Sequence, residues 1–523
     1  MKKHPQGMAR FLTTPLFLGA AVLAVVAAVY CQVFSFQFLP FWDDDIHIHK
    51  NPLYAPLSWG SVALFWEAPF QQLYIPVTYT VWAGLVALSR LLAGTSVAFG
   101  PYNPAVFHGA NLAVHLLSTL MVFQILRRML PAVFASRNLG TNRFLLASSG
   151  GALAFGLHPI QVEAVAWVSG LRDLLGGAFS LASLALFLRA LDMSREGRAS
   201  WREYCGATLL LLLALGSKPG SVVTPALALF CGGWLLRSRG SSLRPLWWLL
   251  PWFLVAAAEV VMTSKSQPAA ELARGLVPVW ARPLVGADTL AFYLGKLVWP
   301  FSLCPDYGRS PNSLFAAGVL YWSWLVPLLL TGVLGCVRGL RPFLLPFALL
   351  VIGVLPTLGL MPFNFQIVST VSDHYLYLAM LGPGLACAMA LCLLPAWAGI
   401  ASSLLLATGW GILSLLQLPQ WASGDLFFPA ILSQNPTSWK SRHNYACTLD
   451  AQGKLPQALA EFQEALRLRP SNAEAHNDLA LTLLKSGRRP EAIQSFQNSL
   501  QVRPTSGAAR NLAAALLMNG DPL

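Results

Sequence analysis

Three consecutive carboxylates, Asp43, Asp44 and Asp45, follow the first hydrophobic segment of a chain that otherwise carries few charges. A carboxylate close to an attacking hydroxyl group can accept its proton and so act as a general base. Adjacent carboxylates can raise one another's pKa, which makes one a better base and leaves another for orientation or for a metal ion. Asp44 and Asp45 are therefore the candidate bases. A solvated acidic loop or a helix cap is the alternative.

The composition indicates that these carboxylates belong to a membrane protein. Hydrophobic residues make up 55% of the chain and charged residues 11%, and the mean hydropathy is +0.56, which excludes a soluble globular protein. The net charge of +13 does not indicate a nucleic-acid partner, because the arginines fall in short loops where they set membrane orientation. The eight cysteines are scattered without CxxC spacing, so neither disulfides nor a metal cluster is indicated.

The first hydrophobic segment, Phe11 to about Val33, follows Lys2, Lys3 and Arg10. A signal peptide has a similar pattern, but this segment is about 20 residues long and further hydrophobic segments follow. We therefore expect a retained signal anchor with the N-terminus in the cytoplasm.

The positive-inside rule decides two doubtful segments. Counting Ile75 to Leu92 as a span would put Arg127 and Arg128 outside, so residues about 57 to 95 are expected to form interfacial helices on the outer side. Residues 283 to 300 are treated in the same way. The other expected spans lie near residues 104–126, 145–158, 174–190, 204–217, 221–236, 245–263, 318–337, 343–361, 375–394 and 397–418. The total of about eleven puts the C-terminal tail outside.

The tail becomes polar after about residue 435 and repeats at an interval of 34 residues, which is the signature of tetratricopeptide (TPR) helical hairpins. The matching pairs are Gly453 and Gly487, Ala458 and Ala492, Phe462 and Phe496, and Pro470 and Pro504. Repeats are predicted at about 439–472 and 473–506, with a partial third at about 507–520. The array could bind a peptide on its concave surface, or it could serve as a dimerisation or spacer module.

These patterns predict an all-α protein with two domains. A polytopic transmembrane domain would occupy residues 1–434, with an outer loop at 34–103 that carries the acidic motif. A TPR domain would occupy residues 435–523.

With this topology, most of the polar residues that would be costly in lipid fall on the outer side. They are Asp43, Asp44, Asp45, His158, Glu163, Arg172, Asp173, Lys218, Arg282, Asp373 and His374. Their clustering on one side predicts a site shared between the bilayer and the outer compartment.

Several motifs resemble a known family. They are FWDDDIHIHKNP, YIPVTYTVW, FHGANLAVHLL, LHPIQVEAVAWVSGLRDLL, SKPG, YLGKLVWP and SDHYLYL, in this order and ahead of TPR repeats. The chain is similar to bacterial membrane TPR proteins related to the eukaryotic transmembrane-and-TPR O-mannosyltransferases, which are placed in the GT-C class of glycosyltransferases. The resemblance implies a GT-C-like fold and inverting transfer of a sugar from a polyprenyl-phosphate carrier to an acceptor on the outer face.

The resemblance also implies roles for charged residues. The family's loop carboxylates correspond to Asp43, Asp44 and Asp45, where a base would take the proton of the acceptor hydroxyl. Because the leaving group is a lipid phosphate, cationic side chains must meet it near the headgroups. The candidates are Arg172, Lys218, Arg282 and His374.

Each cation has a structural alternative. Lys218 ends one hydrophobic run before Pro219 begins the next, yet it could simply snorkel to the interface. Arg172 could pair with Asp173 or Glu163, and Arg282 could be an interfacial anchor. The family pattern has an arginine at the position of His374, and a histidine can be uncharged near neutral pH, which weakens its phosphate role. Asp373 could orient His374 or pair with another cation.

Histidines offer a second kind of chemistry. A divalent metal site built from His47, His49, His158 and Glu163 is possible, although no tight ligand spacing occurs and no other cofactor is indicated. His108 and His115 share one helix face, where an interhelical hydrogen bond is favoured over catalysis.

The sequence thus predicts a polyprenyl-phosphate-dependent glycosyltransferase of the bacterial inner membrane. Its acceptors would be Ser or Thr hydroxyls of exported proteins, bound with help from the TPR array. A non-catalytic membrane TPR scaffold and a transporter are the alternatives, although neither intramembrane charge pairs nor inverted repeats are evident.

Overall fold

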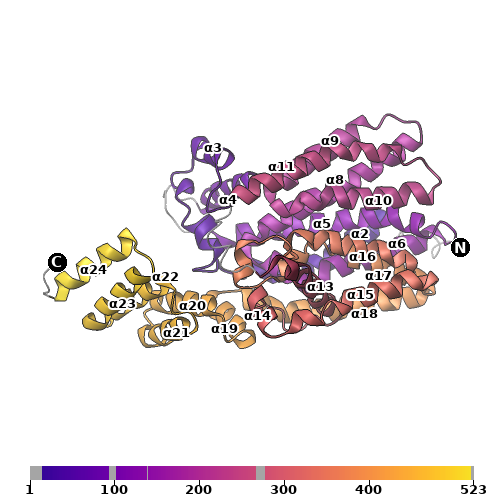
Figure 1. Ribbon diagram of the computed structural model, residues 1–523. Helices are drawn as coiled ribbons and strands as arrows, with labels where there is room; N and C mark the ends of the chain where they lie inside the picture. Colours follow the sequence, from indigo (N-terminus) through magenta and orange to yellow (C-terminus); the bar gives the residue numbers. More distant parts are fainter. Residues whose placement is uncertain (1–13, 94–101, 138, 267–276, 520–523) are drawn as a thin grey trace, which may run out of the picture. The chain divides into compact units, whose positions relative to one another are not determined.

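The computed structural model describes residues 14–93, 102–137, 139–266 and 277–519, so Lys2, Lys3 and Arg10 lie outside the described residues. The described secondary structure is helical, apart from one isolated bridge between Phe70 and Leu73 (Figure 1). The prediction of an all-α protein is confirmed.

By their contacts the residues form two compact units. Unit 1 comprises Met1–Phe36, Asn51–Pro305 and Arg309–Pro419. Unit 2 comprises Gln37–Lys50, Asp306–Gly308 and Gln420–Leu523, so the acidic motif belongs to the same unit as the TPR repeats. The predicted division into 1–434 and 435–523 stays a prediction.

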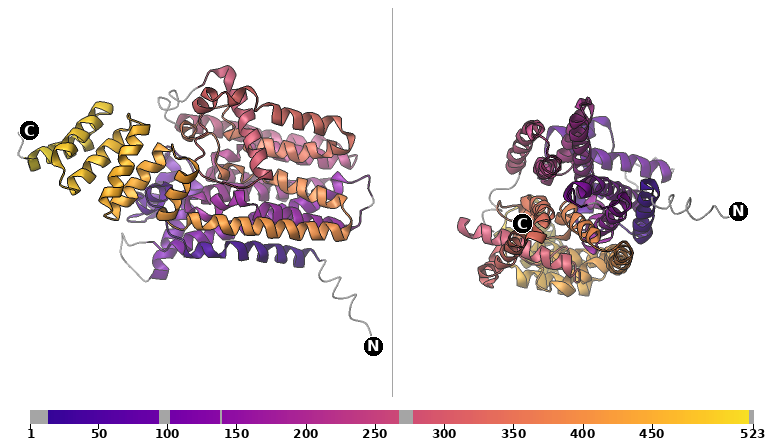
Figure 2. Two further views of the ribbon diagram at one scale, coloured as in Figure 1. Left: turned by 90° about the horizontal axis from the view of Figure 1, so that it is seen from below. Right: turned by 90° about the vertical axis from the view of Figure 1, so that its right-hand side faces the viewer.

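Unit 1 is a bundle whose long helices lie side by side along a common direction (Figures 1 and 2). Its first eight helices are α2 (Pro15–Tyr30), α3 (Trp59–Glu67), α4 (Pro76–Ala93), α5 (Pro104–Val133), α6 (Thr141–Leu157), α7 (Val162–Ala166), α8 (Leu171–Arg195) and α9 (Trp201–Ser217). The others are α10 (Thr224–Ser238), α11 (Leu250–Ser266), α13 (Arg282–Val298), α14 (Pro311–Ala316), α15 (Leu325–Cys336), α16 (Leu344–Val354), α17 (Leu381–Leu393) and α18 (Ala396–Gln417).

Nine of the described helical segments are long and apolar enough to cross a membrane. Eight of them coincide with predicted spans, which supports a multi-pass membrane protein. The predicted spans at 145–158, 204–217 and 375–394 correspond to α6, α9 and α17. These helices have 17, 17 and 13 residues, so each is shorter than any of the nine segments. The ninth segment is α4, which the positive-inside argument assigns to the membrane interface.

Small residues allow the central helices of unit 1 to approach closely. A Cβ atom at Gly151 on α6 would lie 2.5 Å from the backbone oxygen of Gly384 on α17. Close approach of this kind is how helices associate in lipid, where burying apolar surface gives little driving force. Polar contacts add to it, because the two ring nitrogens of His115 lie 3.0 Å from the Tyr377 hydroxyl and from the Gly156 backbone oxygen. His115 therefore makes the expected interhelical hydrogen bonds.

Unit 2 contains antiparallel helical hairpins stacked in sequence order (Figure 2). Its helices are α19 (Gly424–Gln434), α20 (Trp439–Ala451), α21 (Leu455–Leu468), α22 (Ala473–Lys485), α23 (Arg489–Val502) and α24 (Ser506–Asn519). Gly453 and Gly487 follow the first helix of each repeat with φ of 74° and 76°, a left-handed conformation that glycine adopts without strain. The equivalent residues Phe462 and Phe496 are both buried in the shared core.

Candidate functional site

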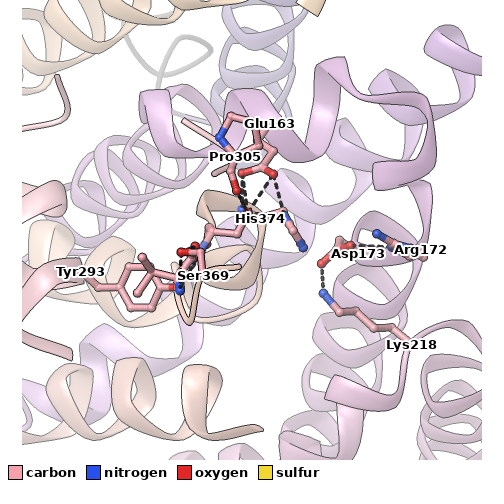
Figure 3. Close-up of polar contacts among 10 residues, drawn as sticks. Glu163, Arg172, Asp173, Lys218, Tyr293, Pro305, Ser369 and His374 are labelled. Carbon is pink, nitrogen blue, oxygen red and sulfur yellow. Dashed lines mark hydrogen bonds and ion pairs between the residues drawn. The ribbon is translucent and has the colours of Figure 1, made fainter. Parts of the chain in front are cut away.

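The predicted outer residues of unit 1 gather where several helices end. Helix α6 ends at Leu157, and Pro159 in the next turn cannot continue it, so the chain turns through α7 before α8 begins at Leu171. Helix α9 ends at Ser217, and Pro219 starts the turn that leads to α10. A short 3-10 helix, Asp373–Leu376, reaches the same place from a distant part of the chain. These turns position Glu163, Asp173, Lys218 and His374 (Figure 3).

Glu163 on α7 is the centre of a buried hydrogen-bond network. Its carboxylate accepts hydrogen bonds from the Nδ1 of His374 at 2.8 Å, from the His374 backbone amide at 3.1 Å and from the Ser372 hydroxyl at 3.0 Å. Ser372 is held in turn by Tyr293, whose hydroxyl donates to its backbone oxygen at 3.1 Å. One carboxylate thus fixes the whole segment that carries His374.

The network sets the protonation of both partners. Burial alone would raise the pKa of the Glu163 carboxyl, but its contacts with His374 and with the hydroxyl of Ser372 lower it. Burial lowers the pKa of His374, an effect that Glu163 opposes and that Lys218 and Arg172 reinforce. The hydrogen-bond pattern places the His374 proton on Nδ1, so the other ring nitrogen is an acceptor. Figure 3 shows that nitrogen on the side that faces Asp173 and Lys218.

A second buried carboxylate, Asp173, holds two cations. Its oxygens contact the Nζ of Lys218 and lie 3.6 Å from the Nε of Arg172, and only 1% of the Asp173 side chain is exposed. Burial and the Arg172 charge lower the pKa of Lys218, whereas Glu163 raises it. The ion pair with Asp173 favours the charged ammonium group. The pairing of Arg172 with Asp173, which was the structural alternative to a phosphate role, is present, and Lys218 shares the same carboxylate.

A glycine and two aromatic rings shape the surroundings of these cations. A Cβ atom at Gly176 on α8 would lie 2.9 Å from the Cβ of Lys218, so only glycine permits this approach without a shift. The Arg172 guanidinium lies 4.8 Å from the centre of the Trp167 ring, and the Lys218 ammonium lies 5.6 Å from that of Tyr375. Cation–π contacts of this kind stabilise positive charge where water is scarce.

Three predicted residues lie apart from this network. His158 uses both ring nitrogens, which lie 3.2 Å from the Leu297 backbone oxygen and 3.3 Å from the Ile160 amide, so its role here is to hold the turn. Asp373 is buried, and its negative charge raises the pKa of the Lys296 ammonium, in opposition to the larger effect of burial. Arg282 begins α13, and among the described residues it makes no hydrogen bond to Glu163 or Asp173.

Residues that the sequence did not single out support the His374 segment. Ser372 and Tyr293 are of types that occur throughout the chain, and no spacing pattern distinguishes them. Arg309 makes two hydrogen bonds, of 2.8 and 2.7 Å, to the buried carboxylate of Asp288. The Arg309 backbone oxygen also accepts from the Thr370 amide at 2.9 Å. For these supporting residues, the signal in the sequence is the unusual charge of Asp288 within an apolar stretch.

The acidic motif of unit 2 is held by its own neighbours. Asp44 accepts the Leu39 amide at 3.0 Å, and Asp45 accepts the Phe41 amide at 2.9 Å and the Lys50 ammonium at 2.7 Å. Burial opposes ionisation of Asp45, but these bonds, together with His49, lower its pKa to about 2. Asp43 is only partly buried. Asp45 is thus a weak proton acceptor in this conformation.

Among the described residues, one group of side chains has the geometry of metal ligands, and it differs from the predicted set. His443, Cys447 and Asp478 in unit 2 place one ligand atom each within 4.8 Å of the others. In the possible set of His47, His49, His158 and Glu163, the first two residues belong to unit 2 and the last two to unit 1, so that set stays a prediction.

These features define the protein as a multi-pass helical membrane protein with a buried charged site and C-terminal TPR repeats. Family profiles described as "TPR repeat" and "Tetratricopeptide repeat" match residues 450–487 and 477–522, which confirms the predicted array.

The chain is also similar to proteins named protein O-mannosyl-transferases. It is 31% identical to TMTC1 of Homo sapiens over 208 residues, which are 38% of this chain and 21% of the relative. It is 30% identical to TMTC1 of Mus musculus over 203 residues (38% and 20%), and 31% identical to Tmtc2 of Drosophila melanogaster over 150 residues (29% and 14%). The matched parts span about a fifth or less of these relatives.

Proposed function

We propose that this protein is a membrane glycosyltransferase that moves a mannose-like sugar from a polyprenyl-phosphate carrier to Ser or Thr hydroxyls of exported proteins. The reaction would be a direct displacement with inversion, as in GT-C enzymes. The enzyme would sit in a bacterial inner membrane with its N-terminus in the cytoplasm and its TPR repeats outside. The O-mannosyl-transferase names of the similar proteins support the reaction class.

One observation carries the proposal, namely the pair of cations beside Asp173. Lys218 and Arg172 come from two different helix ends, and both are oriented by the same buried carboxylate. Burying charges in a membrane protein is costly, so such groups usually mark a binding or reaction site. Two adjacent cations next to aromatic rings suit a lipid-linked phosphate, whose negative charge grows as the sugar leaves.

His374 takes a different part in this proposal. Because its pKa is lowered, the ring is neutral near pH 7 and adds no charge to the phosphate site. Its free nitrogen can instead accept a hydrogen bond from a hydroxyl group of the sugar. Glu163 is a positioning residue, because it orients this ring and does not face the ligand itself.

The acidic motif carries a separate part of the proposal. Asp44 or Asp45 would take the proton of the acceptor hydroxyl, with Asp43 as a supporting carboxylate. The low pKa of Asp45 favours Asp44, because an efficient general base has a pKa closer to the working pH. The TPR repeats would bind the acceptor chain. A divalent metal ion could take part in the reaction, but the proposal does not require one.

The test is transfer of labelled sugar from polyprenyl-phosphate-mannose to exported proteins in membranes that contain the full chain. Lys218→Met should lower transfer by about 100-fold or more, since it removes a charge from the transition state. Lys218→Arg, which keeps the charge, should retain part of the activity. Lys265→Met, which removes an exposed lysine at the end of α11, is the matched control and should have no effect.

Equal transfer by Lys218→Met and by the control would contradict the phosphate site. Asp44→Asn and Asp45→Asn test the base separately, and transfer that survives in both variants would reject it. A reporter fused after Leu523 tests the orientation. If no donor supports transfer, the non-catalytic scaffold becomes the better explanation.

A further inference from the structure

The first two TPR repeats bring together three side chains whose chemistry suits a transition-metal ion. His443 and Cys447 stand four residues apart on α20, so they share one face of that helix, and Asp478 approaches them from α22. The His443 Nε2 lies 2.9 Å from the Asp478 Oδ2, and the Cys447 Sγ lies 3.8 Å from the same oxygen. An imidazole, a thiol and a carboxylate are the three ligand types that Zn²⁺ binds in proteins.

The separations fit a single ion. All three ligand atoms lie within 4.8 Å of one another. Ligands of a tetrahedral Zn²⁺ ion are about 3.3 to 3.8 Å apart, given bonds of about 2.0 to 2.3 Å. Small side-chain rotations would therefore bring all three ligands to bonding distance without any movement of the helices.

The carboxylate also has the outer support that metal ligands usually have. The amide group of Asn477 donates to Asp478 Oδ1 at 3.1 Å, which leaves Oδ2 directed at His443 and Cys447. Asn511 on α24 donates to Asn477 at 3.0 Å, so the support reaches the third repeat. Partners of this kind orient a ligand and typically change metal affinity by about 10- to 100-fold.

Solvent can reach the group. The Asp478 side chain is 34% exposed, and it borders a hollow of about 330 Å³ that is also lined by Asn477 and Asn511. An ion could enter from this side, and a water molecule could complete its coordination.

We propose that His443, Cys447 and Asp478 form a binding site for a zinc-like divalent cation that clamps the first TPR repeat to the second. The thiol loses its proton to solvent on binding, and the ion then neutralises the thiolate and the carboxylate. The site has three protein ligands and one open position. This proposal does not depend on the transfer reaction, because it concerns the TPR repeats alone.

The experiment uses the full chain, purified in detergent and stripped of metal. Titration with Zn²⁺ against a chromophoric chelator should reveal one site per chain that Cys447→Ser, His443→Ala and Asp478→Asn each weaken by about 100-fold. Titration with Co²⁺ should produce a sulfur-to-cobalt absorption band that Cys447→Ser abolishes. Asn477→Ala should weaken binding by about 10-fold.

Two variants serve as matched controls. His476→Ala changes a histidine on α22 that bonds to the Pro470 backbone oxygen, and Cys336→Ser changes an exposed cysteine of unit 1. Both should leave metal binding unchanged. Hydrogen exchange should show that Zn²⁺ slows exchange in α20 and α22 of the wild type only, and that the metal-free variants match the metal-free wild type.

Absence of stoichiometric uptake would overturn the proposal and leave a plain His443–Asp478 ion pair between repeats. Uptake unaffected by Cys447→Ser and Asp478→Asn would equally reject it, because the ion would then be bound elsewhere.

Discussion

Two groups of buried carboxylates in this protein differ in where their partners come from. Asp45 binds groups four and five residues away, Phe41 and Lys50, so it holds its own loop. Glu163 binds His374, which lies 211 residues further along the chain. Hydrogen bonds between residues near in sequence stabilise a turn. Hydrogen bonds between residues far apart in sequence hold the ends of different helices close together, where they can form a site. The sequence separation of the partners therefore distinguishes these two groups of carboxylates, whereas their charge alone does not.

The largest expected effect comes from breaking the long-range network. Glu163→Gln replaces the carboxylate that accepts three buried hydrogen bonds and should lower the free energy of unfolding by about 3 kcal/mol, because hydrogen bonds to a charged acceptor are lost or weakened. Denaturation of the purified chain in detergent measures the change. Glu259→Gln is the control, because Glu259 is also buried but, among the described residues, accepts its hydrogen bond from Thr263 in its own helix. A loss of the same size in both variants would remove the distinction between near and distant partners.

A smaller effect is expected where α8 meets the Lys218 turn. Gly176→Ala places a methyl group 2.9 Å from the Cβ of Lys218, and such overpacking costs about 1–3 kcal/mol. Gly84→Ala on α4 meets no atom within 4 Å and should be neutral or slightly stabilising. Thermal unfolding of both variants in detergent measures the difference. A neutral Gly176→Ala would show that the turn adapts freely and that Lys218 is not held in place.

The local hydrogen bonds of Asp45 should make the stability of the protein depend on pH in the acid range. The folded pKa of Asp45 is about 2, against an ordinary value of 3.8. A depressed carboxyl pKa adds stability above the unfolded pKa, and that stability is lost as the pH falls from about 4 to about 2. The contribution is up to about 2 kcal/mol. Asp45→Asn should remove this part of the acid dependence when the unfolding midpoints of both proteins are followed from about pH 6 to about pH 2. Parallel curves for the two proteins would argue against a depressed pKa.

The smallest effect is expected at an exposed ion pair between residues far apart in the sequence. It tests whether sequence separation alone, without burial, makes an ion pair important for stability. Lys485 contacts Asp450 of the preceding repeat, and its side chain is 53% exposed. Lys485→Met should change the free energy of unfolding by less than about 1 kcal/mol, because water screens exposed ion pairs. Arg198→Met, which breaks the exposed pair with Glu196, is the control and should behave alike. A loss as large as that of Glu163→Gln would show that burial is not the deciding factor.

The sequence predicted the features that follow a short repeating pattern. The TPR repeats could be located because Phe462 and Phe496 occupy equivalent core positions 34 residues apart. Most spans could be located because lipid demands an uninterrupted apolar stretch. Helix α17 is shorter than the span predicted at 375–394, because the 3-10 turn Asp373–Leu376 precedes the helix.

The sequence predicted which residues belong to the site better than it predicted which of them contact one another. Glu163, Arg172, Lys218 and His374 were all among the polar residues that the sequence predicted for the outer side. That Glu163 meets His374, and that Lys218 shares Asp173 with Arg172, depends on how distant segments pack, and no local pattern encodes it. Ser372 was missed for the same reason, since its hydroxyl matters only because Glu163 lies beside it.

The tie between Glu163 and the His374 segment also has a thermodynamic consequence for binding. Three donors from Ser372 and His374 converge on this one carboxylate, so the segment cannot loosen without leaving a buried charge unsatisfied. The segment therefore loses its conformational entropy during folding, before any ligand binds. A ligand that arrives later finds the ring already oriented, so less of its binding free energy is lost in ordering the protein, and more is left for affinity or for the reaction.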